Sequence, residues 1–395
     1  MPSGPVLRDG GASILPKGDA NVARVDGEPM AAVLTTLEPL IRLLRSDGYV
    51  VVGPTVRDGA IVLAEIERAG DLPHGWGVST GPGVYRITRR EDTAAFGHSA
   101  GPQAWKRFLH PPREQLLSVN QDGGEVRFSE PEPPDVRYAF LGVRPCDLRA
   151  IGVQDRILGV GARYARRRER AFLIAVNCTE PSATCFCVSA GGGPAAEEGF
   201  DLVLTELTEP DSDPRYVASA GSPAGQRVLD ELPHGTADTG LEARAGELVS
   251  AAAGRMGRAL PEVDLRVMLE STLEADRWND VAARCLACGN CTMACPTCFC
   301  TSVTDTTDLT GDHAERWQHW ASCYETDYSY LHGGPVRPTI RSRYRQWLTH
   351  KLGTWHDQFG ESGCVGCGRC IVWCPVGIDI TEEATALASV WTDST

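Results

Sequence analysis

Fifteen cysteines carry the clearest chemical signal in this chain of 395 residues. Four of them follow the spacing C-x2-C-x2-C-x3-C and end at Cys295, which precedes a proline, and four more repeat the spacing and end at Cys374, again before a proline. This doubled run is typical of proteins that hold two [4Fe-4S] clusters. Three thiolates on one tight loop can each bind one iron of a cubane, and the fourth cysteine of each run binds the other cluster.

This crossed arrangement predicts the ligands. We expect the first cluster to be held by Cys285, Cys288, Cys291 and Cys374. We expect the second cluster to be held by Cys364, Cys367, Cys370 and Cys295. Small residues inside the runs, Gly289, Gly366 and Gly368, would let the backbone wrap close to each cluster. Zinc is the alternative occupant, but zinc sites usually combine two separate C-x2-C pairs, so the unbroken runs favour iron–sulfur.

Four of the remaining cysteines fall in the first half of the chain. Cys146 and Cys178 each follow an apolar segment that we expect to be a strand, and Cys185 and Cys187 come shortly after Cys178. Because strand ends gather at one edge of an α/β sheet, these four thiols could converge and hold a third cluster. The other interpretation is that they are free thiols that pack as small apolar side chains. The sequence leaves both interpretations open.

The last three cysteines, Cys298, Cys300 and Cys323, are one thiol short of a complete ligand set. They could hold another cluster with a ligand other than cysteine, or contribute to the N-terminal group. The pattern favours a role in packing, or in tuning the neighbouring clusters from a position next to their ligands.

Apolar runs separated by turn residues predict the elements that must position these cysteines. Strands are expected at 49–56, 60–66, 83–90, 137–145, 171–177 and 200–207. Helices are expected at 32–44, 147–158, 241–260 and 265–285. The strand-helix-strand order around Cys146 is typical of an α/β sheet, and the last two helices lead into the first cysteine run.

The sequence therefore predicts an α/β fold (or α+β) for the N-terminal part, followed by a mainly helical, ferredoxin-like domain with two clusters. We expect a disordered tail over residues 1–30, rich in Gly, Pro and Asp, an α/β domain with a candidate third cluster site over 31–240, and the helical lead-in and two-cluster domain over 241–395. Residues 296–363 separate the two cysteine runs, which predicts a long insertion in the two-cluster domain.

Composition excludes several classes of protein. The formal net charge of −14 argues against nucleic-acid binding, which depends on lysine and arginine. The sequence has no apolar run of about eighteen residues, so we expect no membrane span, and its start has no secretory signal, so we expect a cytoplasmic protein. An odd number of cysteines in such a chain does not suggest a disulfide scaffold.

Five segments together resemble the iron–sulfur β subunit of cytoplasmic NAD(P)-linked [NiFe] hydrogenases of the sulfhydrogenase type, and they are similar to the A subunit of anaerobic sulfite reductase. These segments read GVRPCDLRAI, NCTEPSATCFC, CLACGNCTMACPTCFC, RSRYRQWLTHKL and CVGCGRCIVWCP. The resemblance extends over roughly residues 30 to 385. One segment, GGPVRP at 333–338, departs from the Gly-Gly-His-Asn that the resemblance implies there.

The resemblance implies a hetero-oligomer. A flavin subunit would exchange hydride with NAD(P)H, this chain would relay single electrons, and the hydrogenase small and large subunits would carry them to a nickel–iron site. On this interpretation the chain has no catalytic residue and binds neither nickel nor flavin. The alternatives are a subunit of sulfite reductase, then a self-contained reductase that uses the Cys-Phe-Cys thiols, then a nucleic-acid protein with a structural cluster.

Overall fold

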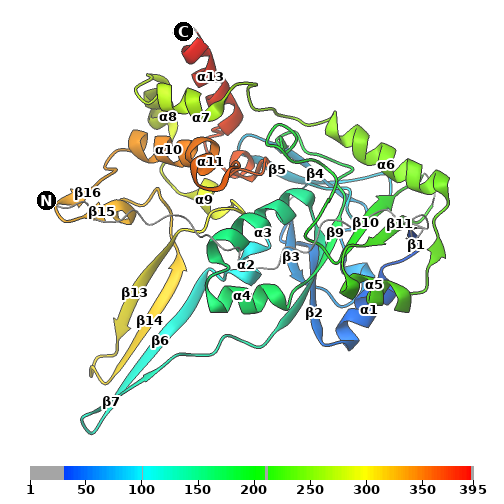
Figure 1. Ribbon diagram of the computed structural model, residues 1–395, viewed down its shortest axis with the longest axis horizontal. Helices are drawn as coiled ribbons and strands as arrows, with labels where there is room; N and C mark the ends of the chain where they lie inside the picture. Colours follow the sequence, from blue (N-terminus) through cyan, green and yellow to red (C-terminus); the bar gives the residue numbers. More distant parts are fainter. Residues whose placement is uncertain (1–30, 100, 210–211, 393–395) are drawn as a thin grey trace, which may run out of the picture. The chain divides into compact units, whose positions relative to one another are not determined.

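The computed structural model describes residues 31–99, 101–209 and 212–392, which form two main sheets with helices around them (Figure 1). The tail expected over residues 1–30 lies outside the described residues. The fold class is the predicted one, because a mixed α/β region precedes a mainly helical region that contains both cysteine runs. The expected domain boundary near residue 240 stays a prediction.

The larger sheet has eight strands in the order β12-β1-β11-β10-β9-β8-β2-β3. Its central strands β2, β8, β9 and β10 run parallel, and the outer strands pair antiparallel. Parallel strands that are covered on both faces are apolar throughout, and all five residues of β9 are buried. The strands are β1 (Ala32–Leu34), β2 (Tyr49–Arg57), β3 (Ala60–Glu65), β8 (Arg137–Val143), β9 (Phe172–Val176), β10 (Leu202–Leu207), β11 (Arg215–Ala220) and β12 (Gly235–Thr236).

Helices cover this sheet (Figure 1). The first of them buries Leu40, Ile41 and Leu44 in the same apolar core as the strands, which fixes its inner face. The helices of this region are α1 (Glu38–Ser46), α2 (Lys106–Leu109), α3 (Pro145–Leu158), α4 (Ala162–Glu169), α5 (Pro223–Glu231) and α6 (Thr239–Ala253).

The segment β8-α3-β9 has the predicted strand-helix-strand order. Helix α3 begins at Pro145, directly after β8, and the fixed φ of proline suits a first helical turn. Cys146 and Asp147 therefore lie in the first turn of α3, at the carboxyl end of the parallel strands.

Three predicted helices have different bounds in the structure. The helix expected at 32–44 is divided into β1 and α1, because residues 32–34 pair with β11 and the helix begins only at Glu38, with Pro39 in its first turn. The helix expected at 241–260 ends at Ala253, before Gly254. The helix expected at 265–285 is two helices, α7 (Leu265–Ser271) and α8 (Arg277–Arg284).

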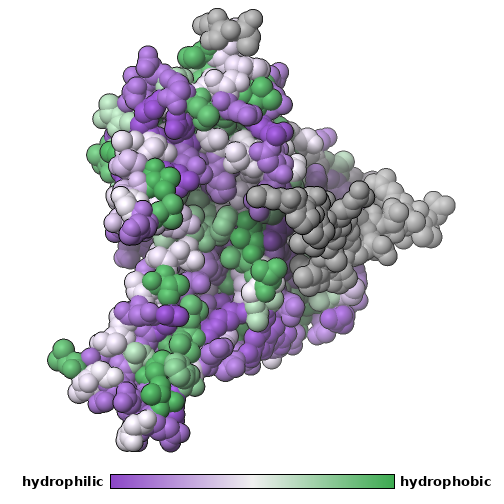
Figure 2. Space-filling model, turned by 60° about the vertical axis from the view of Figure 1, so that its left-hand side comes forward, coloured by the Kyte–Doolittle hydropathy of each residue, from purple (hydrophilic) through white to green (hydrophobic). Residues whose placement is uncertain are grey.

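The second sheet has four antiparallel strands in the order β13-β14-β6-β7, and Figure 1 shows it apart from the large sheet. Strands β6 (Arg113–Asp122) and β7 (Glu125–Ser129) come from the N-terminal region, and β13 (Thr301–Thr307) and β14 (His313–Trp320) come from the insertion between the cysteine runs. The sequence does not predict this sheet, because β6, β13 and β14 carry polar residues on both faces. Strand β7 alternates polar and apolar residues, but it is exposed along its whole length. On the face that Figure 2 shows, hydrophobic side chains gather in several small groups among polar ones.

Around the cysteine runs the chain is helical, with a core that includes Trp278, Leu348, Leu352 and Leu387. The helices are α9 (Asn290–Met293), α10 (Ile340–Thr349), α11 (Trp355–Phe359), α12 (Arg369–Val372) and α13 (Ile380–Thr392), with a π-helical turn, η3, at His350–Thr354. Two small hairpins, β4 (Trp76–Gly81) with β5 (Val84–Arg89) and β15 (Tyr330–Leu331) with β16 (Gly334–Pro335), complete the strands. In the part of the chain that the structure describes, no helix has both the length and the apolar character needed to cross a membrane.

Candidate metal centres

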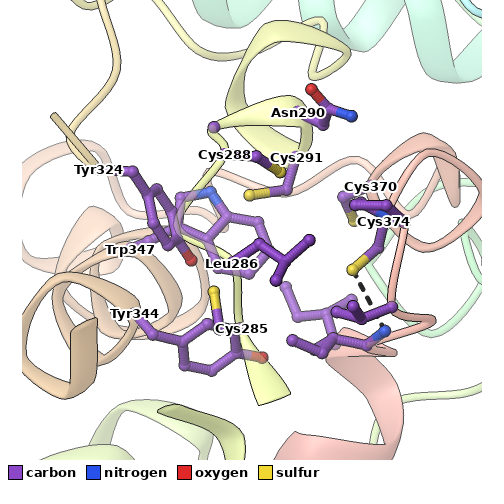
Figure 3. Close-up of a pocket in the computed structure, with 15 residues that line it drawn as sticks. Cys285, Leu286, Cys288, Asn290, Cys291, Tyr324, Tyr344, Trp347, Cys370 and Cys374 are labelled. Carbon is purple, nitrogen blue, oxygen red and sulfur yellow. Dashed lines mark hydrogen bonds between the residues drawn. The ribbon is translucent and has the colours of Figure 1, made fainter. Parts of the chain in front are cut away.

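The four cysteines expected to hold the first cluster surround one cavity of about 450 Å³ (Figure 3). Cys285 follows the end of α8, Cys291 lies in α9, and Cys288 lies between them. Cys374, from the second run, completes the set from the opposite wall. The structure therefore places three cysteines of the first run around one cavity with Cys370 and Cys374 of the second run. The assignment of Cys374, rather than Cys370, to this cluster stays a prediction.

Backbone amide groups around the first cavity point toward the sulfur atoms. Ala287 has a φ of 51° and Gly289 a φ of 75°, so the chain turns tightly between the cysteines. The Ala287 N–H donates to the Cys285 Sγ at 3.4 Å, and the Ile378 N–H donates to the Cys374 Sγ at 3.3 Å. Hydrogen bonds of this kind stabilise thiolates and influence the reduction potential of a cluster.

Aromatic side chains form one wall of the first cavity, and another wall reaches the surface. Tyr324, Tyr344 and Trp347 line the buried side (Figure 3). On the other side Cys288 is exposed, and Leu286 is 62% exposed. The first cavity is therefore closed by buried aromatic side chains on one side and open to solvent on the other.

The second set of cysteines lies deeper. Cys295 interacts electrostatically with the thiols of Cys364, Cys367 and Cys370, so all four lie in one neighbourhood. Burial raises the pKa of the Cys364 thiol to about 12. A hydrogen bond from Cys298, helped by the Lys351 ammonium, instead lowers the pKa of the Cys295 thiol well below its ordinary value. A thiol that ionises easily is well suited to bind iron.

Two buried lysines accompany this second set. Lys106 Nζ donates to the backbone oxygens of Cys295 and Cys298 at 3.1 and 3.0 Å, and it lies 3.8 Å from the centre of the Trp320 ring. Lys351 Nζ donates to Thr297 Oγ1 at 2.6 Å. Both lysines are only 4% exposed. Their positive charges compensate the negative charge that four thiolates and a cluster bring into the interior.

The loop of the second run packs directly against the Cys-Phe-Cys loop of the N-terminal region. The Phe186 N–H donates to the Gly366 carbonyl at 2.8 Å. A Cβ atom on Gly366 would lie 2.5 Å from the Cys187 Cα, and one on Gly368 would lie 2.3 Å from the Thr184 carbonyl oxygen. Glycine is therefore required at both positions by close backbone approach as well as by positive φ angles of 67° and 72°.

The four N-terminal cysteines line a second cavity, of about 400 Å³. Its lining includes Cys146, Cys178, Cys185 and Cys187. Burial raises the pKa of the Cys187 thiol to about 12 and also raises the pKa of Cys178. Cys367 of the second run lines the same cavity, so this group of thiols adjoins the second set.

A buried ion pair joins these two regions. Arg369, next to the third cysteine of the second run, donates from Nη1 and Nη2 to the two carboxylate oxygens of Asp147 at 2.8 and 3.1 Å. Both side chains are almost fully buried. A two-point pair between arginine and carboxylate fixes orientation, so α3 and α12 are held in one geometry.

The three unassigned cysteines interact with members of the cluster sets and with one another. Cys298 is hydrogen-bonded to Cys295, and Cys300 is hydrogen-bonded to the Tyr328 hydroxyl. Cys323 interacts electrostatically with Cys300 and with Cys291 of the first set. Their expected role in packing and tuning stays a prediction.

The arrangement of the cysteines around the first cavity fits an iron–sulfur cluster. Among the residues that the structure describes, no group of three or more His, Cys, Asp or Glu side chains gathers closely enough to bind one ion. Zinc requires its thiolates at about 2.3 Å from one point. A cubane carries one iron for each cysteine, so its ligands stand around a volume. The cysteines around the first cavity have this second arrangement, which fits a [4Fe-4S] cluster.

Several residues around the cysteines were not found from the sequence. Lys351 and Arg369 lie inside segments that carry the resemblance, but their sequence positions do not reveal which thiols or acids they contact. For Lys106 the sequence offered only a weak indication. This lysine lies between Trp105 and Phe108, and a lysine is buried only where partners satisfy its charge. Met256, which contacts the Cys187 sulfur at 3.7 Å, had none.

Comparison with known proteins agrees with this geometry. A family model described as a 4Fe-4S dicluster domain matches residues 284–378, which contain all eight cysteines of the two runs, so the chain carries two [4Fe-4S] clusters. Among curated proteins, the sulfhydrogenase 2 subunit beta of Pyrococcus furiosus is 31% identical over 280 residues, covering 69% of this chain and 79% of the relative. No solved structure matches the chain.

Proposed function

Because this chain belongs to the family of sulfhydrogenase β subunits, we propose that it relays single electrons between a flavin subunit that reacts with NAD(P)H and a [NiFe] hydrogenase module. The chain is an iron–sulfur electron-transfer subunit. The partners and the direction of transfer belong to the proposal. On this proposal the partner subunits carry out the hydride and hydrogen chemistry, and this chain connects them.

The adjacency of the two cysteine sets supports this proposal most directly. Cys370, assigned to the second set, also lines the cavity of the first set. Cys370 also interacts electrostatically with Cys291 of the first set. Ligands of the two clusters are therefore neighbours. Each [4Fe-4S] cluster, when bound, accepts and releases one electron without bond making or breaking at a substrate.

The residues around the cysteines give each set a different task. Tyr324, Tyr344 and Trp347 keep water from the back of the first cavity, and the exposed side at Cys288 and Leu286 gives a partner's redox group a place to approach. Around the second set the lysines described above supply positive charge in the interior. This arrangement suits a surface station for exchange with a partner and an interior station for relay.

A complex purified without oxygen, by a tag on this chain, tests the proposal. Under H₂ we expect the [4Fe-4S] EPR signals of this chain to appear, and we expect added NAD(P)⁺ to be reduced. If H₂ leaves the clusters oxidised and sulfite instead oxidises dithionite-reduced clusters, the chain works with sulfite reductase as its A subunit. In that case the hydrogenase proposal is wrong.

A pair of variants on α9 asks whether transfer depends on the first cluster. Cys291→Ser removes an assigned ligand, and we expect loss of one EPR signal and of H₂-dependent NAD(P)⁺ reduction. Met293→Leu changes a neighbour on the same short helix without removing a thiol, and we expect both signals and transfer to remain. Full transfer in Cys291→Ser that lacks the first cluster would remove that cluster from the path.

A further inference from the structure

We propose that Cys146, Cys178, Cys185 and Cys187 bind a third [4Fe-4S] cluster. The four thiols line one cavity of about 400 Å³, although 41 positions separate the first from the last in the sequence, from 146 to 187. The number of thiols is the number that a cubane requires, one for each iron. This site goes beyond the dicluster domain, because all four cysteines precede the matched residues 284–378.

The parallel sheet explains why these cysteines meet. Strands β8 and β9 are direct neighbours, so the residues that follow them come out at the same edge. Cys146 lies in the first turn of α3 after β8, and Cys178 follows β9 by two positions. The chain after Cys178 then folds back, because the Cys178 N–H donates to the Pro194 carbonyl at 2.8 Å and the Cys185 N–H donates to the Ser182 carbonyl at 3.1 Å.

The cavity is built for sulfur and negative charge. The Ser182 backbone N–H and hydroxyl lie 3.4 and 3.2 Å from the Cys185 Sγ, as donors to a thiolate would. Arg144 lines the cavity and is held by the Phe96 and His98 carbonyls, to which its Nη2 donates at 2.5 and 2.7 Å. A fixed guanidinium compensates the charge of four thiolates and a cluster.

A cluster suits this cavity better than zinc does. The four cysteines line one cavity, and zinc would need their thiolates at about 2.3 Å from one point. Among the described residues, no group of three or more His, Cys, Asp or Glu side chains gathers that closely. Free thiols would explain burial but would not require four of them to face one space. The Met256 sulfur on the same wall adds an apolar, polarisable surface that excludes water.

The position of the site gives it a role in the relay. Cys367 lines this cavity, whereas Cys370, three residues later, lines the first cavity, so the second set lies between the other two. We therefore place the third cluster at the end of the relay opposite the exposed first cluster. One electron would leave the reduced second cluster and reduce the oxidised third cluster, or pass the other way, and neither step needs a proton. This role rests on the proposed function, whereas the metal site itself does not.

Iron and acid-labile sulfide per chain test the site in the anaerobically purified protein. We expect about twelve irons, from three clusters of four. Cys178→Ser and Cys185→Ser should each lose about four irons and four sulfides and keep the EPR signals of the other two clusters. Met256→Leu, on the same cavity wall, should keep about twelve. About eight irons in the wild-type protein, unchanged in the cysteine variants, would overturn the site.

A second measurement does not depend on how the variants fold. Anomalous scattering at the iron edge from crystals of the wild-type protein should give a third group of iron peaks enclosed by these four cysteines. Peaks only at the two motif sites, or a single zinc peak in this cavity, would overturn the inference and leave the proposed function intact. Failure of H₂ to reduce any cluster, with three iron groups present, would instead contradict the proposed function and leave the third site in place.

Discussion

The two cysteine runs have the same spacing, but the chain surrounds them in opposite ways. In the first run the residue after the first cysteine, Leu286, is 62% exposed, and its counterpart in the second run, Val365, is 2% exposed. The residue before the third cysteine is the exposed Asn290 in one run and the buried Arg369 in the other. Among the contacts described above, buried lysines lie beside the second set of cysteines and not beside the first.

This difference shows that the spacing of the cysteines and the surroundings of the cysteines are determined by different parts of the sequence. The spacing of the cysteines determines a backbone that can wrap a cluster, because both runs turn with positive φ at equivalent positions, Ala287 with Gly366 and Gly289 with Gly368. Exposure and charge come from elements far away in the sequence, such as α3 and the Cys-Phe-Cys loop. Equivalent substitutions in the two runs should therefore have unequal effects.

The largest difference is expected at the position before the third cysteine. Arg369→Ala leaves Asp147 buried without its partner, and we expect it to lower the free energy of unfolding by about 3–5 kcal/mol. Asn290→Ala in the first run removes one long hydrogen bond to the Trp373 carbonyl, and we expect a change of about 0.5 kcal/mol or less. Anaerobic denaturant unfolding of both variants compares them, and equal losses would contradict the distinction between the runs.

A second pair of variants exchanges glycine and alanine. Gly366→Ala places a methyl group against the backbone of Cys187, and we expect a loss of about 3 kcal/mol together with loss of iron from the second cluster. Ala287→Gly, at the equivalent position with the same sign of φ, should change stability by about 1 kcal/mol or less. Iron content and thermal unfolding measure both. A stable, fully loaded Gly366→Ala protein would show that the two loops are not in close contact.

The lysine contacts predict a difference in reduction potential. Lys351→Met removes a positive charge beside the second set, so the reduced cluster becomes less stable, and its potential should fall by on the order of 60 mV. The potential of the first cluster should change less, because the Lys351 contacts lie around Thr297 and Gly363. A redox titration followed by EPR separates the two signals. An equal shift in both would mean that the charge acts on the whole domain.

The smallest effect is expected inside α9. Thr292 donates to the Gly289 carbonyl and is hydrogen-bonded to the Ser322 hydroxyl, both at 2.7 Å, whereas its counterpart in the second run is the apolar Ile371. Thr292→Val should therefore cost about 1 kcal/mol, and the double variant with Ser322→Ala should cost less than the sum of the single variants. Strict additivity in this cycle of anaerobic unfolding measurements would show that the two hydroxyl groups do not stabilise each other.

Much of the large sheet could be predicted from the sequence, because apolar β2, β8, β9 and β10 are covered on both faces and read as short apolar runs. The four-stranded sheet could not. Three of its strands, β6, β13 and β14, carry polar residues on both faces. The pairing of β6 with β14 joins segments about two hundred positions apart, which no local pattern records.

The candidate sites show the same division. The spacing of the motif cysteines was enough to predict two clusters. It gave no sign that Lys106 would contact the backbone at Cys295, because that contact depends on how α2 packs near the insertion. The sequence allowed the N-terminal cysteines to converge as one of two interpretations, since the ends of parallel strands share an edge of the sheet. The packing of their loop against Gly366 and Gly368 could not be predicted.

The pairing of β6 with β14 also has a consequence for how the protein is made. During synthesis β6 leaves the ribosome long before β14 exists, because Gln115 and Glu315, which are hydrogen-bonded across the pair, are 200 positions apart. Until then the β6-β7 hairpin has an open strand edge, which invites association with other chains. Strand β14 is synthesised after the first cysteine run and before the second, so the sheet can close before either crossed set of cysteines is complete.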